Sequence, residues 1–202
     1  MLHTRLNDED EGEDTSRDEA ASAQVDKLFF KSRNVIITGG IDDKLARRTV
    51  AHLLALAQDS DDPINLFISS PGGHVESGDM VHDMIQFIRP TVRCIGSGWV
   101  ASAGALIFVG AKRENRFCLP NTRFLLHQPS GGIGGQVTDM QIQANQIRIM
   151  RDRFHHLFAE ATGQTPERIA EDTQRDFWLN TDEAIEYGLL GKVITSVDDL
   201  PS

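Results

Sequence analysis

Ser102 is the residue whose surroundings most favour chemistry. It stands within residues 98–106, where every neighbour is small or apolar. An apolar stretch precedes it and a helix-like run follows, so we expect a strand-to-helix turn with unpaired helix N–H groups beside the hydroxyl. Such a serine can act as a nucleophile when a base takes its proton. A serine that only caps the helix has the same pattern and is commoner, so Ser102 alone does not predict an enzyme.

His127 could be that base. It follows the apolar residues 124–126 and precedes a loop rich in proline and glycine, which places the ring at a surface or in a cleft. Imidazole titrates near neutral pH, as a general base should. A histidine that only satisfies a backbone group at a strand end is the plainer alternative. Four later aspartates could orient the ring, and residue physics does not choose among Asp139, Asp152, Asp172 and Asp176.

A glycine turn supplies a third feature of a hydrolase site. Residues 70–73 read Ser-Pro-Gly-Gly after an apolar, strand-like stretch. Consecutive glycines let backbone N–H groups point at a carbonyl oxygen, as an oxyanion hole requires, although an ordinary turn has the same composition. Each feature is weak alone. Together they favour a serine nucleophile in a Ser-His-Asp triad, whose members can occur in any chain order.

The elements that carry these residues alternate between strands and helices. Apolar stretches predict strands at residues 34–38, 64–68, 91–95, 123–127 and 192–195. Periodicity and capping residues predict helices from Asp42, after Gly73, within residues 96–112, from Thr138 to Gly163, from Pro166 and from Thr181. Thr138 and Gln141 form a capping-box pattern. This alternation predicts a single α/β domain over residues 26–202, with parallel strand pairing.

The helix from Thr138 is long for a single domain. Its length of about 25 residues exceeds the mean of roughly 11 to 12. Its apolar stripe needs a covering surface, which either this chain or another subunit could supply. The stripe consists of Met140, Ile147, Phe154 and Phe158. We therefore expect self-assembly, with this helix in the contact.

Composition restricts the partners and the compartment. The 202 residues carry a net charge of −10, and the first 20 contain eight acidic residues against Arg5 and Arg17. We expect residues 1–25 to form an acidic, disordered tail, and a nucleic-acid partner is disfavoured. Cys94 and Cys118 lack metal-site spacing, and two half-buried thiols fit a reducing compartment. Without an apolar signal segment or about 20 consecutive apolar residues, we expect a cytoplasmic protein with no membrane contact.

Longer blocks of sequence occur in a characteristic order. They are Ile68-Ser-Ser-Pro-Gly-Gly73, Ile85-Gln-Phe-Ile-Arg-Pro90, Ala101-Ser-Ala-Gly-Ala105, Phe117-Cys-Leu-Pro-Asn121, His127-Gln-Pro, Gly135-Gln-Val-Thr-Asp139, Thr162-Gly-Gln, Asp172-Thr-Gln-Arg-Asp176 and Glu183-Ala-Ile-Glu-Tyr-Gly188. With these blocks the chain resembles, from about residue 34 to residue 195, the Clp protease proteolytic subunit family, ClpP. The resemblance implies the ClpP/crotonase-like fold and a serine endopeptidase.

The resemblance also assigns roles to particular residues. It implies that Ser102 is the nucleophile, His127 the general base and Asp176 the residue that orients it. The backbone N–H groups of Gly73 and Ala103 would form the oxyanion hole. Ala103 replaces a methionine that is usual in the family, but it keeps the N–H group.

An assembly is implied as well. Family members form two stacked seven-membered rings that enclose the active sites, and an AAA+ unfoldase feeds them polypeptide by using ATP. The subunit itself would need no metal, nucleotide or other cofactor. Residues 131–135 and the helix from Thr138 would join the rings. Two departures predict weak unfoldase docking: Asn65 stands where the family usually has an aromatic residue, and the acidic residues 1–25 lack its apolar axial loop.

Two other functions remain open from the sequence. A crotonase-like acyl-CoA enzyme would use a related fold and oxyanion hole without a triad, which would make Ser102, His127 and Asp176 coincidental. A catalytically silent ring subunit could serve as a scaffold for an active relative. Reaction of Ser102 with a fluorophosphonate separates the first from a peptidase, and peptidase activity of the purified chain separates the second.

Overall fold

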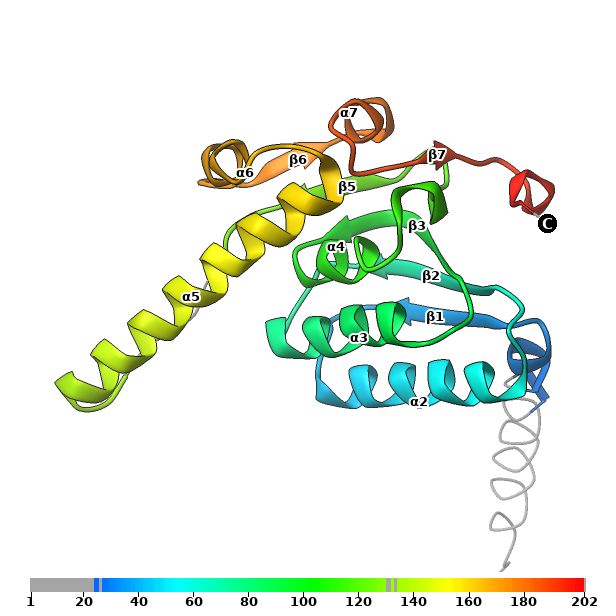
Figure 1. Cartoon of the computed structure of the whole chain (residues 1–202), viewed down its shortest axis with the longest axis horizontal. Coiled ribbons are helices and arrows are strands. Elements are labelled where there is room, and N and C mark those ends of the chain that lie inside the picture. The colour runs from blue at the N-terminus through cyan, green and yellow to red at the C-terminus, as the bar shows by residue number, and fades with distance from the viewer. Residues whose placement is uncertain (1–23, 26, 130–131, 133, 202) are drawn as a thin grey trace, which may run out of the picture.

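Seven strands form one sheet in the part of the chain that the computed structural model describes, residues 24–25, 27–129, 132 and 134–201 (Figure 1). Five are parallel, in the order β1 (Asn34–Thr38), β2 (Ile64–Ser70), β3 (Val92–Ala101), β4 (Arg116–Cys118) and β7 (Lys192–Val193). The last residues of β3 also pair in parallel with β5 (Arg123–Leu126), and β5 pairs antiparallel with β6 (Phe177–Leu179). The sheet therefore branches at β3.

Helices cover one face of this sheet. α2 (Asp43–Asp59), α3 (Val75–Phe87) and α4 (Ala103–Phe108) lie side by side and pack on β1, β2 and β3 (Figure 1). α5 (Val137–Thr162) projects from this body as a long arm, while α6 (Pro166–Asp172) and α7 (Thr181–Glu186) lie near β5 and β6. Two short 3₁₀ helices, η1 (Arg113–Asn115) and η2 (Val197–Asp199), are also described, and residues 27–31 before β1 are helical.

The alternation along β2 separates the two faces of the sheet. Ile64, Leu66 and Ile68 are fully buried in the main core. Asn65 and Phe67 lie on the opposite face, as the period of two along a strand predicts. There Phe67 packs on a second, smaller apolar cluster. The glycine turn leaves the end of β2, so the core fixes the strand that presents it.

Elements with strong local signals are confirmed. β1 spans the predicted residues, and Asp42 caps α2 by accepting the Leu45 N–H at 2.7 Å. Pro166 occupies the start of α6, where its missing N–H and fixed φ suit the first turn. In each case, the chemistry of one or two neighbouring residues sets the boundary.

Two predicted caps are wrong. α5 begins at Val137 after Gln136, and no side chain caps it, so Thr138 and Gln141 form no capping box. α7 is capped by Asn180 rather than by Thr181. Asn180 accepts from the Glu183 N–H at 3.0 Å, and Glu183 accepts from the Asn180 N–H at 2.8 Å, which satisfies two helix-end donors at once.

Residues 96–112 differ most from the prediction. β3 continues to Ala101, and only Ala103–Phe108 are α-helical. Gly96 serves the close packing of the longer strand, since a Cβ there would lie 3.0 Å from Val100 Cγ2 and 3.2 Å from Thr122 Cγ2. β4 and β6 escape prediction because three residues show no periodicity. The antiparallel β5–β6 pair is an exception to the parallel pairing expected.

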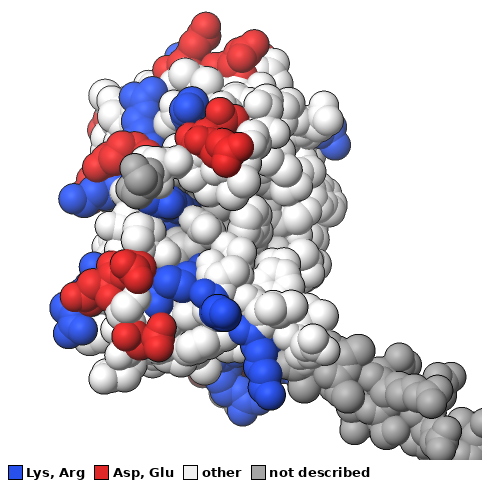
Figure 2. All heavy atoms as spheres, turned by 90° about the vertical axis from the view of Figure 1, so that its right-hand side faces the viewer, with Lys and Arg blue, Asp and Glu red and all other residues white. Residues whose placement is uncertain are grey.

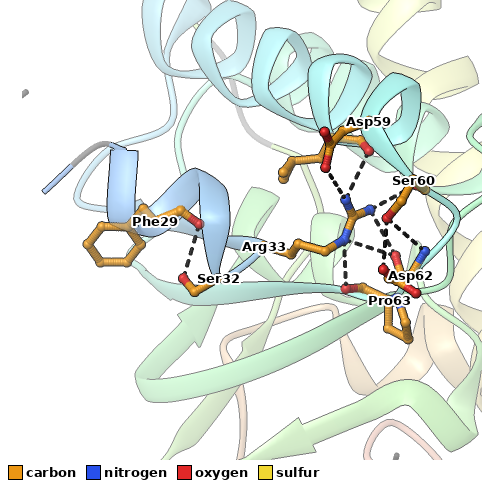
Figure 3. Close-up of polar contacts among 8 residues, drawn as sticks. Phe29, Ser32, Arg33, Asp59, Ser60, Asp62 and Pro63 are labelled. Atoms are coloured by element: carbon orange, nitrogen blue, oxygen red, sulfur yellow. Dashed lines mark hydrogen bonds and ion pairs between the residues drawn. The ribbon is translucent and has the colours of Figure 1, made fainter. Parts of the chain in front are cut away.

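Arg33 fastens the start of the sheet to the end of α2 (Figure 3). Its φ is 57° and its side chain is 11% exposed. The guanidinium donates to backbone carbonyls and faces one carboxylate, and these partners are Leu56, Ser60, Asp62, Pro63 and Asp59. Burying such a charge is costly unless it is hydrogen-bonded, and the carbonyls that end a helix need donors. Arg33 therefore fixes the turn into β2, the strand that leads to the glycine turn.

The charges on the face in Figure 2 are mixed. Lys and Arg lie interleaved with Asp and Glu on one side of this face, next to a broad uncharged area. This is not the continuous basic surface that nucleic-acid binding favours. Residues 1–23 of the predicted acidic tail lie outside the described residues. None of the described helices is both long and apolar enough to cross a membrane.

Candidate active site

Ser102 occupies a strained junction between β3 and α4. Its φ of 54° and ψ of −119° are unusual for a residue with a side chain, and such strain costs on the order of 1–3 kcal/mol. Its N–H donates to the Leu125 carbonyl of β5 at 2.9 Å, which helps to hold the backbone. The side chain makes no capping hydrogen bond to α4. Ser102 is thus the N-cap residue of α4 by position, but its hydroxyl does not cap the helix.

The glycine turn lies directly against Ser102. Gly72 has a φ of 96°, and a Cβ there would stand 2.6 Å from Ser102 Cβ and 2.9 Å from the Ala101 carbonyl oxygen. Only glycine allows this approach. Sequence reasoning did not single out Gly72, although its position in the Pro-Gly-Gly turn was the available signal.

Gly73 and Ala103 present N–H groups at this site. Gly73 pairs with Ile41 in an isolated parallel bridge, in which the Ile41 N–H donates to the Gly72 carbonyl at 2.9 Å and the Ile41 carbonyl accepts from the His74 N–H at 2.8 Å. Both backbone groups of Ile41 bind the residues on either side of Gly73. The N–H and carbonyl of Gly73 itself therefore point away from Ile41. Ala103 is the first residue of α4, where an N–H has no partner within the helix.

His127 and Asp176 are brought together by strand pairing. Leu126 and Phe177 are opposite each other in the antiparallel β5–β6 pair. His127 directly follows Leu126, and Asp176 directly precedes Phe177, so the two are neighbours across the pair. His127 Nδ1 lies 3.4 Å from Asp176 Oδ1, with side-chain exposures of 31% and 65%. The sequence left four aspartates open, and the structure brings Asp176 to the ring.

The other three aspartates lie elsewhere in the structure. Asp172 accepts from Arg168 Nε at 2.7 Å and from the Tyr187 hydroxyl at 2.8 Å. Burial, together with this bond from its hydroxyl, raises the pKa of Tyr187. α6 ends at Asp172, so no continued helix links it to Asp176. Asp139 and Asp152 lie on α5.

The pairing of β3 with β5 brings the chain segments of Ser102 and His127 side by side. Ala101 pairs with Leu125, two residues before His127. In the part of the chain that the structure describes, no hydrogen bond joins the Ser102 hydroxyl to His127. Catalytic hydrogen bonds are often loose without substrate and tighten in the bound complex. The absence of this bond therefore does not exclude acyl transfer at Ser102.

Neither cysteine competes for the role of nucleophile. Both thiols are fully buried, rather than half-buried as predicted. Burial raises the pKa of Cys94 to about 12 and the pKa of Cys118 to about 11, so neither is a thiolate near neutral pH. Across the described residues, no group of three or more His, Cys, Asp or Glu is arranged to hold a metal ion.

Comparison with known proteins identifies the family. The family model for Clp protease matches residues 16–197. An ATP-dependent Clp protease proteolytic subunit from Paracoccus denitrificans is 76% identical over 166 residues, which is 82% of this chain and 83% of that protein. Proteolytic subunit 3 from Rhizobium etli is 51% identical over 195 residues, 96% of this chain and 100% of that protein.

Solved structures agree with this assignment. ClpP1 from Listeria monocytogenes is 47% identical and has a TM-score of 0.80, covering 88% of this chain and 99% of that chain. The predicted ClpP-like α/β fold is thereby confirmed. The matches also favour a peptidase over the crotonase-like acyl-CoA enzyme, because the relatives are named as protease subunits. The chain therefore belongs to the Clp protease family and is a serine-type peptidase.

Proposed function

We propose that the chain hydrolyses peptide bonds of unfolded polypeptides with Ser102 as the nucleophile. His127 takes the proton from the Ser102 hydroxyl as the oxygen attacks the scissile carbonyl, and Asp176 holds the other ring nitrogen. The N–H groups of Gly73 and Ala103 stabilise the oxyanion of the tetrahedral intermediate. The imidazolium then protonates the leaving amine. Water, deprotonated by the same histidine, releases the acyl group from Ser102.

One observation carries this proposal: adjoining strand ends supply the reacting groups. Ser102 follows β3, His127 follows β5, Asp176 precedes β6, and the turn with Gly73 follows β2. The 3.4 Å separation between His127 Nδ1 and Asp176 Oδ1 supports the pairing of base and acid. The strained backbone at Ser102, without a capping bond, supports its role as nucleophile. A serine or histidine with only a structural role would need neither the strained backbone nor the nearby aspartate.

Peptide turnover of the purified chain tests the proposal. Ser102→Ala should lower turnover by a factor on the order of 10⁶, as in other serine peptidases. Ser97→Ala is the matched control, because it removes a hydroxyl from β3, the strand that Ser102 follows. Loss of activity in the control but not in Ser102→Ala would reassign the nucleophile. An inactive wild type with intact assembly would support the silent scaffold subunit instead.

The open backbone edge at Gly73 supports a polypeptide substrate. The N–H and carbonyl of Gly73 point away from Ile41, and the adjoining Gly72 lies against Ser102. Extended peptides bind by adding main-chain hydrogen bonds to such an edge. A peptide paired there would present its carbonyl to the serine.

Assembly into rings is also part of the proposal. α5 is half covered: Phe154 and Phe158 are buried against the body, whereas Val137, Ile142 and Ile149 are 68%, 55% and 52% exposed. The exposed half of this arm needs a partner surface, which a second ring of the same subunit supplies. Two stacked seven-membered rings are the arrangement that the family resemblance implies.

The partners and conditions follow from the same resemblance. The relatives are subunits of ATP-dependent proteases by name, so we propose an AAA+ unfoldase as the ATP-using partner. The subunit itself would need no cofactor, since the proposed triad uses only water. A cytoplasmic location, which suits the two free thiols, belongs to the proposal as well.

A further inference from the structure

The start of α3 carries a second set of serine, histidine and aspartate, separate from the proposed triad. The Ser77 hydroxyl donates to Asp43 Oδ1 at 2.7 Å. His74 Nδ1 lies 2.9 Å from Ser77 Oγ and 3.2 Å from Asp43 Oδ1, and His74 Nε2 faces Glu76 Oε2 at 3.2 Å. Ser77 is only 3% exposed, so its hydroxyl cannot serve as a nucleophile for a polypeptide. Asp43, His74 and Ser77 can therefore affect catalysis only by holding the backbone at the start of α3.

That backbone connects both proposed oxyanion donors. His74 directly follows Gly73, and its side chain belongs to the set. Gly78, which follows Ser77, lies against α4: a Cβ there would stand 3.2 Å from Ala103 Cβ and 3.4 Å from the Ala103 carbonyl oxygen. The first turn of α3 therefore lies between the two donors and contacts the backbone of each.

Asp43 anchors this turn to α2. It is the first residue of that helix, where the helix dipole favours a negative charge. The hydrogen bond from Ser77 and the proximity of His74 hold the pKa of the Asp43 carboxyl below its usual value, so it is ionised at neutral pH. Two residues earlier, Ile41 binds the glycine turn through its backbone. The connection from β1 to α2 thus holds the glycine turn through Ile41 and the start of α3 through Asp43.

We propose that Asp43, acting through Ser77 and His74, is a positioning residue that aims the Gly73 N–H at the substrate oxyanion. This role rests on the proposed function, because the donor matters only if Ser102 attacks a carbonyl. An oxyanion donor acts mainly in the transition state, so loosening it lowers kcat and leaves KM nearly unchanged. Removing such a donor lowers kcat about 10²–10³-fold, so a misaimed donor should lower it about 10-fold.

Two neighbouring substitutions form a matched pair. Asp43→Asn and Asp42→Asn remove the same charge at the start of α2, but Asp42 binds the Leu45 N–H, and asparagine keeps that capping role. On the purified full-length assembly, Asp43→Asn should lower kcat about 10-fold at constant KM, while Asp42→Asn stays within about twofold. Ser77→Ala, which keeps the Asp43 charge, should match Asp43→Asn.

A transition-state mimic distinguishes positioning from general loosening. A peptide boronate forms a tetrahedral adduct on the nucleophilic serine, so Asp43→Asn should weaken its binding by the same factor as kcat. Equal kcat in the Asp43 and Asp42 variants, or a change in KM alone, would overturn the positioning role and leave Ser102 chemistry intact. Failure of the wild type to react with a fluorophosphonate at Ser102 would overturn the proposed function itself. If Asp43→Asn does not assemble, Ser77→Ala decides by the same comparison.

Discussion

Leu126 lies directly opposite Phe177 in the β5–β6 pair, and this register places His127 beside Asp176. The residue after one antiparallel strand and the residue before its partner are neighbours across the pair. Asp172 is four residues earlier, and its carboxylate binds Arg168 and Tyr187 instead. The register of the β5–β6 pair therefore identifies Asp176 rather than Asp172 as the neighbour of His127. Their spacing in the sequence does not make this distinction.

Substitution of these two aspartates should give opposite results. Asp176→Asn should lower turnover about 10⁴-fold, because an amide offers His127 the wrong tautomer, and should leave Tm unchanged. Asp172→Asn should keep most of the activity but lose about 1–3 kcal/mol of stability, since two donors lose a charged acceptor. Steady-state kinetics and thermal melts measure both. An active Asp176→Asn enzyme beside an inactive, stable Asp172→Asn enzyme would reverse the assignment.

Gly72 should tolerate no side chain. Its φ is 96°, and a Cβ would stand 2.6 Å from Ser102 Cβ, so Gly72→Ala must displace the nucleophile or the turn. We expect a loss of at least about 100-fold in kcat, which a displacement of roughly 1 Å can cause. Gly40→Ala is the control, because a Cβ there meets no atom within 4 Å. Similar kcat values for the two variants would contradict the close approach.

Local signals account for the part of the fold that could be predicted. β1, α2 and α6 follow from a short apolar run, from Asp42 and from Pro166, and each needs only neighbouring residues. The branch at β3 could not be predicted, because β4 and β6 have three residues each and exist through pairing with distant strands. Burial of Cys94 and Cys118 likewise depends on which strands become central.

The residues of the candidate site also differ in how far the sequence alone predicts them. Ser102, His127 and the glycine turn stand out by residue type at strand ends, while the choice of Asp176 rested on a resemblance to a family. The set of Asp43, His74 and Ser77 escapes prediction because a contact across 34 residues joins Asp43 to Ser77. His74 and Ser77 have helical spacing, but nothing in the sequence marks Asp43 as their partner.

The exposed half of α5 should control assembly. Ile149 is 52% exposed, and Ile149→Asp would place an unpaired charge in an apolar contact between rings, which costs several kcal/mol. We expect the native mass to fall to that of a smaller assembly. Gln143→Asp adds the same charge at an exposed position that directly follows Ile142 and faces another side of the same helix, and it should leave the mass unchanged. An unchanged mass for Ile149→Asp would exclude this part of α5 from the contact.

Asn65 should limit coupling to an unfoldase. Its Nδ2 donates to Asn34 Oδ1 at 3.0 Å, whereas its Oδ1 is buried without a hydrogen-bond partner in the described structure. An amide gives an apolar loop less contact area than an aromatic ring, so Asn65→Tyr should degrade a tagged folded substrate at least about fivefold faster with a cytosolic AAA+ unfoldase and ATP. Turnover of a short peptide should not change. Efficient degradation by the wild type, with no gain from tyrosine, would refute the limit.

Covalent labelling of Ser102 tests the central claim most directly. The purified wild-type assembly is treated with a fluorophosphonate, its intact mass is measured, and the modified peptide is sequenced. We predict one adduct per subunit, located on Ser102, with loss of peptide turnover in proportion to labelling. Ser102→Ala should gain no adduct while keeping the native mass. A wild-type assembly that remains unlabelled, or is labelled at another serine while turnover is lost, would contradict the assignment of Ser102 as the nucleophile.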